Sequence, residues 1–428
     1  RRKRALRAHA DAGMTAQPGS PRILSPDAGS DPAPAKLNES SARSMLAVRQ
    51  IRLTDFRNYR QLRLDCGLEP VVLVGGNGTG KTNLLEALSF LAPGRGLRRA
   101  RLDDVCRRQV RGASGGEEPA ATAWAVAATL DTPEGRLVIG TGLEPGRNEG
   151  SLPRRVVRID GKPASSQTAL GLHVAAVWLT PQLDRLFLDG AGERRRFLDR
   201  LVTALHPEHA GDVAAYENAL RQRARLLGEG NRDPHWFTAL EDTMARHGVA
   251  LAAARADTVH RLDAAARLGI GPFPRAALAM AGEIDGWIAA MAAIDAEDRL
   301  RAELAANRLR DAEAGTTSCG PHRSDLAVRH LDLDLPAAEG STGQQKAVLV
   351  SIALAHARLV ALSRGRPPLL LLDEIAAHLD AERRVALFDE IVALGAQSWM
   401  TGTDAELFAP LGGRAQILCV ADGSIVAV

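Results

Sequence analysis

The residues with the clearest chemical potential form a glycine-rich loop that ends in lysine and threonine. Residues 75–82 match the pattern G-x-x-x-x-G-K-[ST] in full. Glycines let backbone N–H groups close around a phosphate, and the positive end of a following helix dipole attracts its charge. In such a loop the lysine binds β- and γ-phosphate oxygens and the hydroxyl residue binds Mg²⁺. The pattern predicts a site for ATP and Mg²⁺ formed by Gly75, Gly76, Asn77, Gly78, Thr79, Gly80, Lys81 and Thr82.

The segments on either side of this loop are those that a phosphate site needs. Residues 71–74 form a continuous apolar run, which is typical of a strand buried on both faces. After the loop, Leu85, Leu88 and Leu91 recur at helical spacing, which predicts a helix over residues 82–92. A chance glycine-rich turn would need neither neighbour. The context therefore favours the phosphate-binding interpretation.

A second apolar run, at residues 369–372, ends in two acids. A buried strand that ends in aspartate suits a Walker B element. In that element Asp373 holds Mg²⁺, directly or through water, and Glu374 polarises the attacking water as general base. Strands often end in acids, so the pattern is weak by itself. In the same chain as a phosphate loop, it predicts that Asp373 and Thr82 are the metal ligands.

Residues 341–346 (STGQQK) precede a predicted helix and resemble the ABC signature, whose usual form is Leu-Ser-Gly-Gly-Gln. A serine hydroxyl, a glycine N–H and a helix dipole together make an anion site. In ABC ATPases this site caps the γ-phosphate of the opposite protomer. Ser341 and Gly343 are therefore predicted to contact nucleotide, with Ser341 catalytic alongside Lys81 and Glu374. The alternative is an ordinary serine N-cap.

Two further segments follow the acids. Residues 377–380 occupy the place of the D-loop of ABC ATPases, which runs across the dimer seam, and the alternative is a helix N-terminus capped by Asp380. Transporter ATPases usually place a switch histidine after the next strand, whereas this chain has Thr401-Gly402-Thr403. Thr401 or Thr403 is a candidate hydrogen-bond donor to the γ-phosphate. Either residue could equally be a plain turn residue.

Composition narrows the class of protein. The net charge of +3 permits nucleic-acid binding without demanding it, and an aromatic content of 4% makes base stacking an unpromising mode. No apolar run of about 18 residues predicts a membrane span. The cysteines lie far apart, which predicts neither a zinc site nor a disulfide framework and suits a reducing cytoplasm. They are Cys66, Cys106, Cys319 and Cys419.

The first 44 residues differ from the rest. They are rich in Pro, Ala, Ser and Arg and show no periodicity, which predicts a disordered extension. A transit peptide is the alternative, although Asp27, Asp31 and Glu39 interrupt it. Because residue 1 is Arg, the chain is interpreted as a fragment or an over-extended reading frame, with Met45 as a natural start.

The remaining residues predict an α/β fold in three parts. Residues 45–181 and 316–428 carry the strand-like runs and the motifs, whereas residues 182–315 are Ala- and Leu-rich and predict a mostly helical lobe. The expected architecture is an ABC-type P-loop ATPase head built from both chain ends, with the helical lobe inserted. Heptads are not sustained, so a long coiled-coil tether is not expected.

Several stretches resemble the RecF family, and the resemblance runs from about Met45 to the C-terminus. The match includes the family's opening FRNY strand, its P-loop with Asn77 and Asn83, an RRxFLD element and a GPHRDD element, in which Ser324 replaces the usual Asp. The threonine at the switch position is also typical of the family. These stretches are residues 51–59, 75–83, 194–199 and 320–325.

The resemblance implies a function in DNA repair and replication, including the response to DNA damage (the SOS response). It implies a cytoplasmic ATP-dependent homodimer that clamps double-stranded DNA at gaps or junctions and hydrolyses ATP slowly, stimulated by DNA. It also implies work with RecR in loading RecA, and a nucleotide contact for Asn83. An open alternative is that hydrolysis merely resets a clamp that ATP binding closes. Substitution of Glu374 distinguishes the two, because it would either abolish DNA binding or lock it on.

At position 182 the sequence departs from the usual RecF pattern, and the role of this residue stays open. ABC proteins keep a glutamine where Gln182 stands, while RecF proteins often have an acid there, and Gln182 is a candidate for positioning water or Mg²⁺.

An ABC-type ATPase subunit serving another partner, such as a transporter, is the alternative function. The long helical insertion, the missing switch histidine and the RecF-like elements argue against it.

Arginine clusters are the candidates for DNA contact. Arginine on a groove neutralises phosphates without reading bases, and at least one cluster is predicted to do so. The alternative for any single arginine is a solvated charged face. The clusters are Arg95, Arg98, Arg99, Arg101, Arg107 and Arg108; Arg194, Arg195 and Arg196; and Arg221, Arg223 and Arg225.

Overall fold

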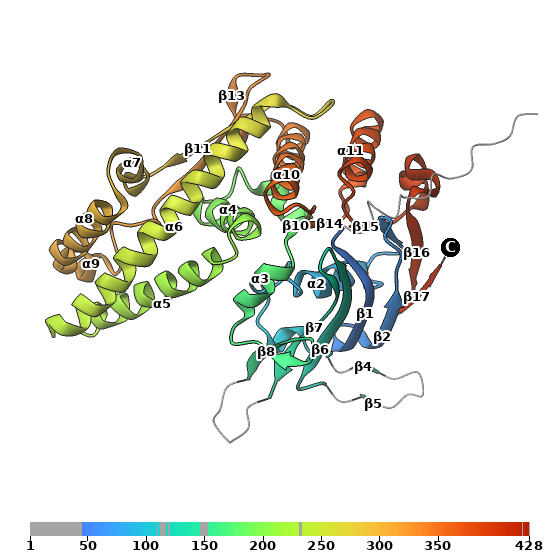
Figure 1. Cartoon of the computed structure of the whole chain (residues 1–428), viewed down its shortest axis with the longest axis horizontal. Coiled ribbons are helices and arrows are strands. Elements are labelled where there is room, and N and C mark those ends of the chain that lie inside the picture. Colours follow the sequence, from blue (N-terminus) through green and yellow to red (C-terminus); the bar gives the residue numbers. More distant parts are fainter. Residues whose placement is uncertain are drawn as a thin grey trace, which may run out of the picture. The chain divides into compact units, whose positions relative to one another are not determined.

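The computed structural model describes residues 45–108, 110–111, 117–118, 120–145, 153–230, 233–421 and 423–427. The extension predicted for residues 1–44 lies outside this part of the chain. Two six-stranded sheets and a group of helices make up the fold (Figure 1).

The first sheet is antiparallel and has the strand order β2-β1-β6-β7-β8-β9. Its long strands alternate buried and exposed residues, as expected for a sheet with one face on the core. This sheet lies within residues 45–181, where the sequence predicted strands. The strands are β1 (Ala47–Phe56), β2 (Tyr59–Asp65), β6 (Trp124–Thr132), β7 (Gly135–Glu144), β8 (Arg154–Ile159) and β9 (Lys162–Pro163), and a separate pair is β4 (Val110–Arg111) and β5 (Glu117–Glu118).

The second sheet brings the two chain ends together. Its order is β10-β14-β15-β3-β16-β17, so β3 from the N-terminal part lies between β15 and β16 from the C-terminal part. The first five strands are parallel, and β17 is antiparallel at the edge. This is the ATPase head that the sequence predicted. The strands are β3 (Val71–Val74), β10 (Ala176–Leu179), β14 (Leu369–Leu372), β15 (Ser398–Gly402), β16 (Gln416–Ala421) and β17 (Ser424–Ala427).

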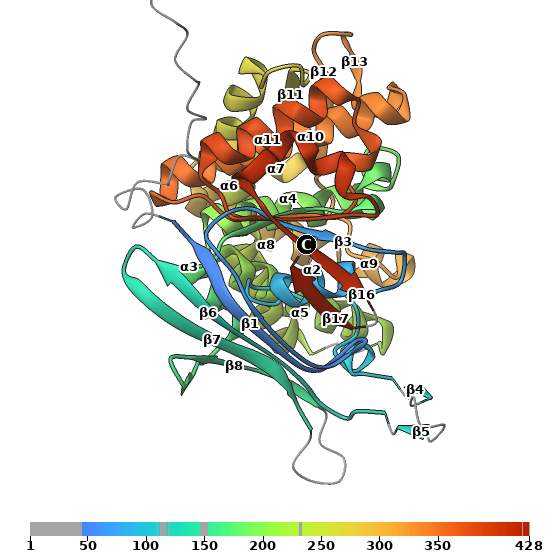
Figure 2. The ribbon, with the colours of Figure 1, turned by 90° about the vertical axis from the view of Figure 1, so that its right-hand side faces the viewer.

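The parallel sheet has a core on each face. Successive side chains of a strand point to opposite faces, so Val72 and Leu370 join one cluster whereas Val71 and Leu369 join the other. The first cluster lies under helices α10 (Thr342–Arg364) and α11 (Ala381–Leu394), and the second surrounds α2 (Lys81–Ser89) and the antiparallel sheet. Figure 2 shows α10 and α11 on one side of the parallel sheet and the antiparallel sheet on the other.

Residues 182–315, the segment predicted to be helical, contain most of the remaining helices. Helix α6 (Pro234–Leu268) joins this segment to the head. The C-terminal part of α6 packs in the head core, through Val259 and Leu262, and its earlier part packs in a separate core through Met244. A strand, β11 (Ala276–Ala281), also lies in this segment and pairs with β12 (Asp325–His330), beyond the predicted boundary. The boundaries at 181/182 and 315/316 stay predictions. The other elements are α3 (Leu170–His173), α4 (Ala191–Leu205), α5 (His209–Gly228), α6 (Pro234–Leu268), α7 (Glu283–Ala290), α8 (Ala293–Ala306), α9 (Arg308–Ala314) and β13 (Leu335–Pro336).

Among the described residues, one helix is long and apolar enough to cross a membrane by length and composition alone, although the sequence predicted none. This helix is α10, whose most apolar window has a mean hydropathy of 1.6. Within the fold, 72% of that window is buried. The helix packs on the parallel sheet as a core helix does, and this burial accounts for its composition.

Candidate functional site

The glycine-rich loop lies between the end of β3 and the first turn of α2. Gly75 and Gly80 have φ angles of 153° and 116°, which L side chains rarely adopt. A Cβ atom at Gly75 would lie 2.3 Å from the carbonyl oxygen of Val420, and one at Gly80 would lie 2.6 Å from Nδ2 of Asn58. Both positions therefore require glycine, and the backbone of the loop stays close to its neighbours.

Lys81 is the first residue of α2 and is only 4% exposed. Its Nζ donates hydrogen bonds of 2.7 Å to the carbonyl oxygens of Gly75 and Gly76, so the ammonium group is folded back over the loop. Burial lowers the pKa of Lys81, while the charges of Glu374 and Asp373 oppose that change. The arrangement holds a cation at the loop, where the sequence predicted phosphate oxygens.

The Walker B residues meet the loop because parallel strands end at the same edge of their sheet. Thr82 Oγ1 donates a hydrogen bond of 2.9 Å to Asp373 Oδ1, across 291 residues of sequence. Thr401 Oγ1, at the end of β15, donates to the same oxygen at 2.8 Å and accepts from the backbone N–H of Glu374 at 2.8 Å. Glu374 has a φ of 54°, an uncommon conformation for a residue with a side chain.

Thr401 lies against the Walker B residues, and a hydrogen bond from it to the γ-phosphate stays a prediction. Its side chain is 1% exposed, and its hydroxyl is engaged by Asp373 and Glu374. It fixes the orientation of the Walker B residues through these two bonds. Thr403 is exposed and follows the end of β15.

The donor set suits Mg²⁺ and a bound phosphate chain. Mg²⁺ prefers oxygen ligands and keeps open positions for phosphate oxygens and water. Thr82 Oγ1 and Asp373 Oδ1 are two such oxygens, already adjacent. Within the described ranges, no group of three or more His, Cys, Asp or Glu could hold a metal. A Mg²⁺ ion held by Thr82 and Asp373 would keep positions for phosphate oxygens and water.

The FRNY element supports the glycine-rich loop through hydrogen bonds to its carbonyl oxygens. The resemblance to the family did not by itself indicate this role. Asn58 Nδ2 donates to the carbonyl oxygen of Thr79 at 3.2 Å, and the Tyr59 hydroxyl donates to that of Gly80 at 3.1 Å. Asn83 donates to Asn58 Oδ1 at 2.7 Å and accepts from Arg98 at 2.6 Å. In this structure the Asn83 amide is used to brace the loop.

The signature residues cap α10. Ser341 Oγ accepts from the N–H of Gln344 at 3.3 Å, and Gln344 Oε1 accepts from the N–H of Ser341 at 2.7 Å, a capping box. Ser341 and Gly343 are exposed. Among the described residues, no hydrogen bond joins Ser341 or Gly343 to the glycine-rich loop or to Asp373. The N-cap alternative and the anion-site prediction are compatible, because both use the same helix end.

The segment carrying Gln182 lies near the signature helix. Gln182 is exposed in a short 3₁₀ turn, Pro181–Arg185, that follows β10. In that turn Asp184 pairs with Lys346 of α10 at 3.1 Å. Similarly, Asp380 caps α11 by accepting from the N–H of Arg383 at 2.8 Å, as the helix-cap alternative for the D-loop segment required.

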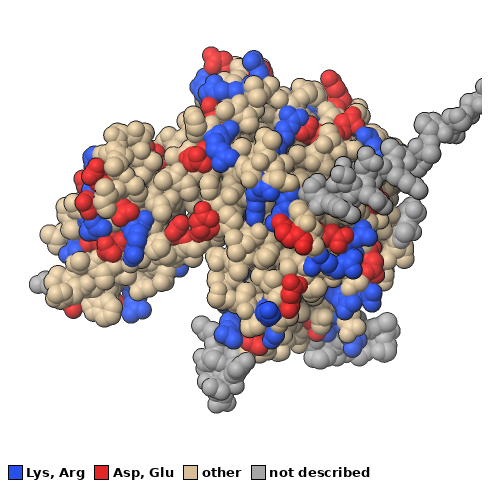
Figure 3. All heavy atoms as spheres, in the orientation of Figure 1, with Lys and Arg blue, Asp and Glu red and all other residues tan. Residues whose placement is uncertain are grey.

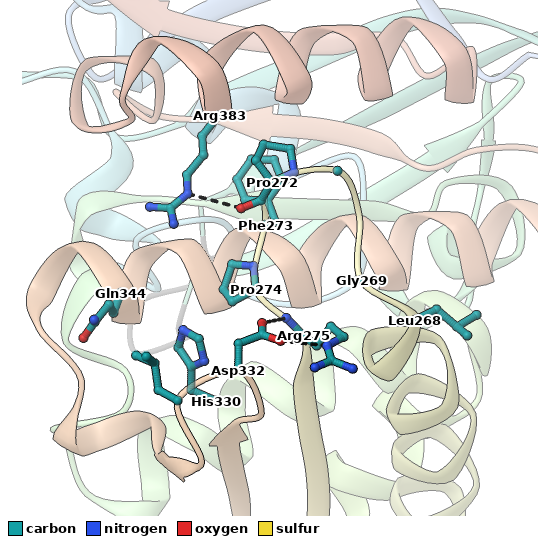
Figure 4. Close-up of a pocket in the computed structure, with 12 residues that line it drawn as sticks. Leu268, Gly269, Pro272, Phe273, Pro274, Arg275, His330, Asp332, Gln344 and Arg383 are labelled. Carbon is teal, nitrogen blue, oxygen red and sulfur yellow. Dashed lines mark hydrogen bonds and ion pairs between the residues drawn. The ribbon is translucent and has the colours of Figure 1, made fainter.

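A hollow of about 530 Å³ adjoins these two helix ends (Figure 4). Arg383 reaches from α11 toward the loop between α6 and β11 and donates to the carbonyl oxygen of Pro272 at 3.4 Å. On the opposite side Arg275 pairs with Asp332 at 2.7 Å. Gln344 of the capping box also lines the hollow. This surface therefore contacts both the signature helix and α11.

The RRxFLD and GPHRSD elements bind each other. Arg194 forms a two-bond ion pair with Asp325, at 2.8 and 2.7 Å, and Arg195 donates to the carbonyl oxygen of Ser324 at 2.6 Å. Arg255 forms a two-bond pair with Asp199, at 2.8 Å for each bond. These contacts fasten α4 to β12 and α6. Two of the three arginines in this predicted DNA-contact cluster are thus used inside the fold.

Most other candidate arginines also have partners. Arg223 is buried between Glu241 and Asp311, and Arg98 pairs with Glu86. Figure 3 shows acidic and basic side chains interspersed on that face of the molecule, without one continuous basic surface. The remaining ion pairs join Arg107 to Asp55, Arg101 to Asp103, Arg196 to Glu193, Arg221 to Glu217 and Arg225 to Glu229.

The parallel sheet, its glycine-rich loop and the adjoining Walker B residues define a P-loop ATPase head of the ABC type. Residues 47–411 match the family described as RecF/RecN/SMC N terminal domain. The chain is 50% identical over 380 residues to the DNA replication and repair protein RecF of Mesorhizobium japonicum, covering 88% of this chain and 97% of that protein. It is 47% identical over 382 residues to the same-named protein of Rhizobium etli, covering 89% and 98%. The chain belongs to the RecF family.

Solved structures agree on the fold. A structure of the recombination mediator protein RecF with ATPrS, from the RecFOR pathway, has a TM-score of 0.74 at 19% identity and covers 90% of this chain and 99% of that one. The corresponding structure with ATP has a TM-score of 0.73 at 18% identity, covering 90% and 98%. The family assignment leaves the transporter-subunit alternative without support.

Proposed function

We propose that this protein binds ATP with Mg²⁺ and hydrolyses it slowly, as a switch that closes and opens a homodimeric clamp on duplex DNA. The clamp acts at single-strand gaps or junctions, in the cytoplasm, during repair and replication restart. The observation that carries the proposal is the convergence of Thr82, Asp373 and Thr401 at one edge of the parallel sheet, beside the glycine-rich loop. Three distant segments meet there with the donors that phosphoryl transfer requires.

Each residue of the site has a distinct role in the proposal. Backbone N–H groups of the loop and Lys81 bind phosphate oxygens, and Thr82 and Asp373 hold Mg²⁺, which would neutralise charge on those oxygens. Glu374 orients and deprotonates the attacking water. Its backbone N–H is fixed by Thr401, so the carboxylate starts from a defined position. Gln182, on the turn after β10, completes the site by positioning water or the metal.

A second copy of the chain completes the ATP site. Ser341 and Gly343 are exposed at a helix N-terminus, a favourable place for an anion. In the described part of the chain they make no hydrogen bond to their own glycine-rich loop. The γ-phosphate that they cap therefore belongs to the partner protomer, and ATP holds the two copies together.

The DNA-binding part of the proposal is supported by membership of the RecF family. Two relatives carry the name DNA replication and repair protein, and two structural neighbours are described as recombination mediators of the RecFOR pathway. We extend these descriptions to this chain, with RecR and the RecA-loading machinery as its partners. The division into lobes at residues 182–315 is part of the same proposal, and limited proteolysis of the purified protein tests it.

The decisive experiment measures assembly state and duplex binding of the full chain with and without ATP. Sedimentation and fluorescence anisotropy are compared for the wild type, Lys81→Met and Glu374→Gln. We expect the Lys81→Met variant to lose ATP binding, dimerisation and DNA binding together, because the cation that binds the phosphate oxygens is removed. Glu374→Gln keeps ATP bound and prolongs the DNA complex. A wild-type protein that binds ATP yet shows no duplex affinity at low salt would refute the proposal.

A further inference from the structure

A large cleft lies between the head and the helical segment. It has a volume of about 1170 Å³ and runs between the residues that follow α2 and the facing sides of α4 and α5. Arginines from the head, Arg95 and Arg99, and from α4, Arg196 and Arg200, line it. These residues are far apart in sequence, so the cluster exists only in the fold.

The acids in the cleft are already neutralised by partners. Glu193 pairs with Arg196, and Glu217 pairs with Arg221 at 3.5 Å. Asp199 pairs with Arg255 at 2.8 Å, and burial, which would raise its pKa, is outweighed by Arg255 and His209, so that the pKa is about 2. Asp189, the other acid of the cleft, lies 3.9 Å from Arg185, so each of these carboxylates already has an arginine partner.

Three arginines of the cleft lack such a partner among the described residues, the exposed Arg95 and the pair Arg99 and Arg200. Among the described residues, no carboxylate lies within ion-pair distance of Arg99 or Arg200. Burial lowers the pKa of Arg200 to about 9, with a further contribution from the charge of Arg99. Burial also lowers the pKa of Arg99, and the charge of Arg196 adds to the effect. Glu217 and Asp199 oppose the shift at Arg99, but each already pairs with another arginine. Guanidinium groups remain protonated in proteins, so the cleft holds Arg99 and Arg200 as two cations without an ion-pair partner of their own among the described residues.

Arg200 is held in a fixed orientation by aromatic rings. Its guanidinium carbon lies 4.8 Å from the centre of the Trp178 ring and 5.6 Å from that of Phe197. Stacking on a ring leaves the N–H edge of the guanidinium group available, and a planar fork of donors matches phosphate geometry. Trp178 is 7% exposed, and its indole N–H has no acceptor among the described groups. The cleft thus contains donors and charge that the fold itself does not use.

We propose that this cleft binds phosphate groups of a nucleic-acid backbone, with Arg99 and Arg200 as the principal contacts. This inference rests on the proposed function and assigns the surface that meets the DNA. The cleft also shares a strand with the ATP site. Trp178 is in β10, where the neighbouring Leu179 accepts from the backbone N–H of Asp373 at 2.9 Å. A phosphate in the cleft therefore binds close to the strand that supports Walker B.

Salt dependence of duplex binding tests the inference. Each phosphate contact contributes about 0.9 to the slope of log affinity against log salt, so Arg99→Gln/Arg200→Gln should reduce that slope by about 2. The matched control is Arg246→Gln/Arg310→Gln, which removes the same charge from two exposed arginines outside the cleft. Anisotropy of a labelled duplex, with ATP present, gives the affinities. The single variant Arg99→Gln, at an exposed position, should lower the slope by about 1 and does not disturb the stacked Arg200.

The outcomes separate this inference from the proposed function. If the wild type binds duplex and the cleft variant keeps the slope of the control, the inference is wrong while the function stands. If the wild type binds no duplex, the function itself fails. Inorganic phosphate and polyglutamate, each at matched ionic strength, identify the ligand. Displacement of duplex by either one only from proteins with an intact cleft would reassign the site to a small anion or an acidic protein segment.

Discussion

Arg223 and Arg200 come from adjacent helices and have opposite surroundings. The Arg223 side chain is fully buried, and it pairs with Glu241 at 3.0 Å and with Asp311 at 2.8 Å. It also donates to Thr317 and to the carbonyl oxygen of Leu304. Arg200 is half-buried and meets aromatic rings but no carboxylate in the described part of the chain. The same residue type is thus a structural cation in one helix and an available cation in the next.

The difference shows that the partners of each arginine, rather than its membership of a cluster, indicate its role. A buried charge is tolerated only when it is paired and hydrogen-bonded, and removing one partner leaves the other uncompensated. For Arg223 the partners come from within the fold. For Arg200 the counter-charge comes from outside, in our proposal from DNA. Substitutions should therefore affect stability in the first case and binding in the second.

The largest expected effect follows from Arg223→Leu. The change leaves Asp311 buried without its cation, and Glu241 keeps only Arg308, so the free energy of unfolding should fall by about 3–5 kcal/mol. Urea unfolding followed by circular dichroism measures this. Arg221→Leu on the same helix is the control, because its exposed pair should contribute less than about 1 kcal/mol. Equal losses for the two variants would show that the buried network does not support the helical segment.

Local patterns account for what the sequence predicted well. The strands β3 and β14 are continuous apolar runs, and the glycine-rich loop and α2 follow β3 directly, so each signal lies within a few residues. The same holds for α10, whose N-cap and helical run are contiguous. Such elements are specified by neighbours in the chain, and the structure confirms them.

Contacts between distant segments could not be predicted in the same way. Nothing near Arg223 in sequence indicates Asp311 or Thr317, and β11 is a strand because β12 pairs with it. For Thr401 the sequence left a choice between phosphate donor and turn residue, whereas the structure shows its hydroxyl bound to Asp373 and Glu374. The supporting role of Asn58 and Tyr59 had a signal, the FRNY element, but its purpose emerges only when β1 and β2 lie against the loop.

A smaller effect is expected from the Asp199–Arg255 pair, and it depends on pH. The pKa of Asp199 is about 2 in the fold and lies near 4 in an unfolded chain, so the charged carboxylate stabilises the fold by about 2 kcal/mol above pH 4. This contribution is lost as the pH falls from about 4 to about 2, because the unfolded chain takes up the proton first.

Comparison with Asp199→Asn isolates that contribution. The difference in unfolding free energy between the wild type and the variant should be largest at pH 5 to 7 and shrink by about 2 kcal/mol toward pH 2. Other carboxylates titrate in both proteins and cancel. A difference that stays constant over this range would mean that the ion pair with Arg255 does not set the titration of Asp199.

The smallest effect on stability is expected for Arg200→Gln. The substitution removes stacking on Trp178 worth about 1 kcal/mol and at the same time removes a half-buried cation that repels Arg99, so the two effects nearly cancel. Unfolding in urea should show a change within about 1 kcal/mol of the wild type, while duplex affinity falls. Arg200→Lys keeps the charge but not the planar fork, and it should recover only part of the affinity. A loss of stability as large as that of Arg223→Leu would place Arg200 among the structural arginines, and the distinction between the two helices would disappear.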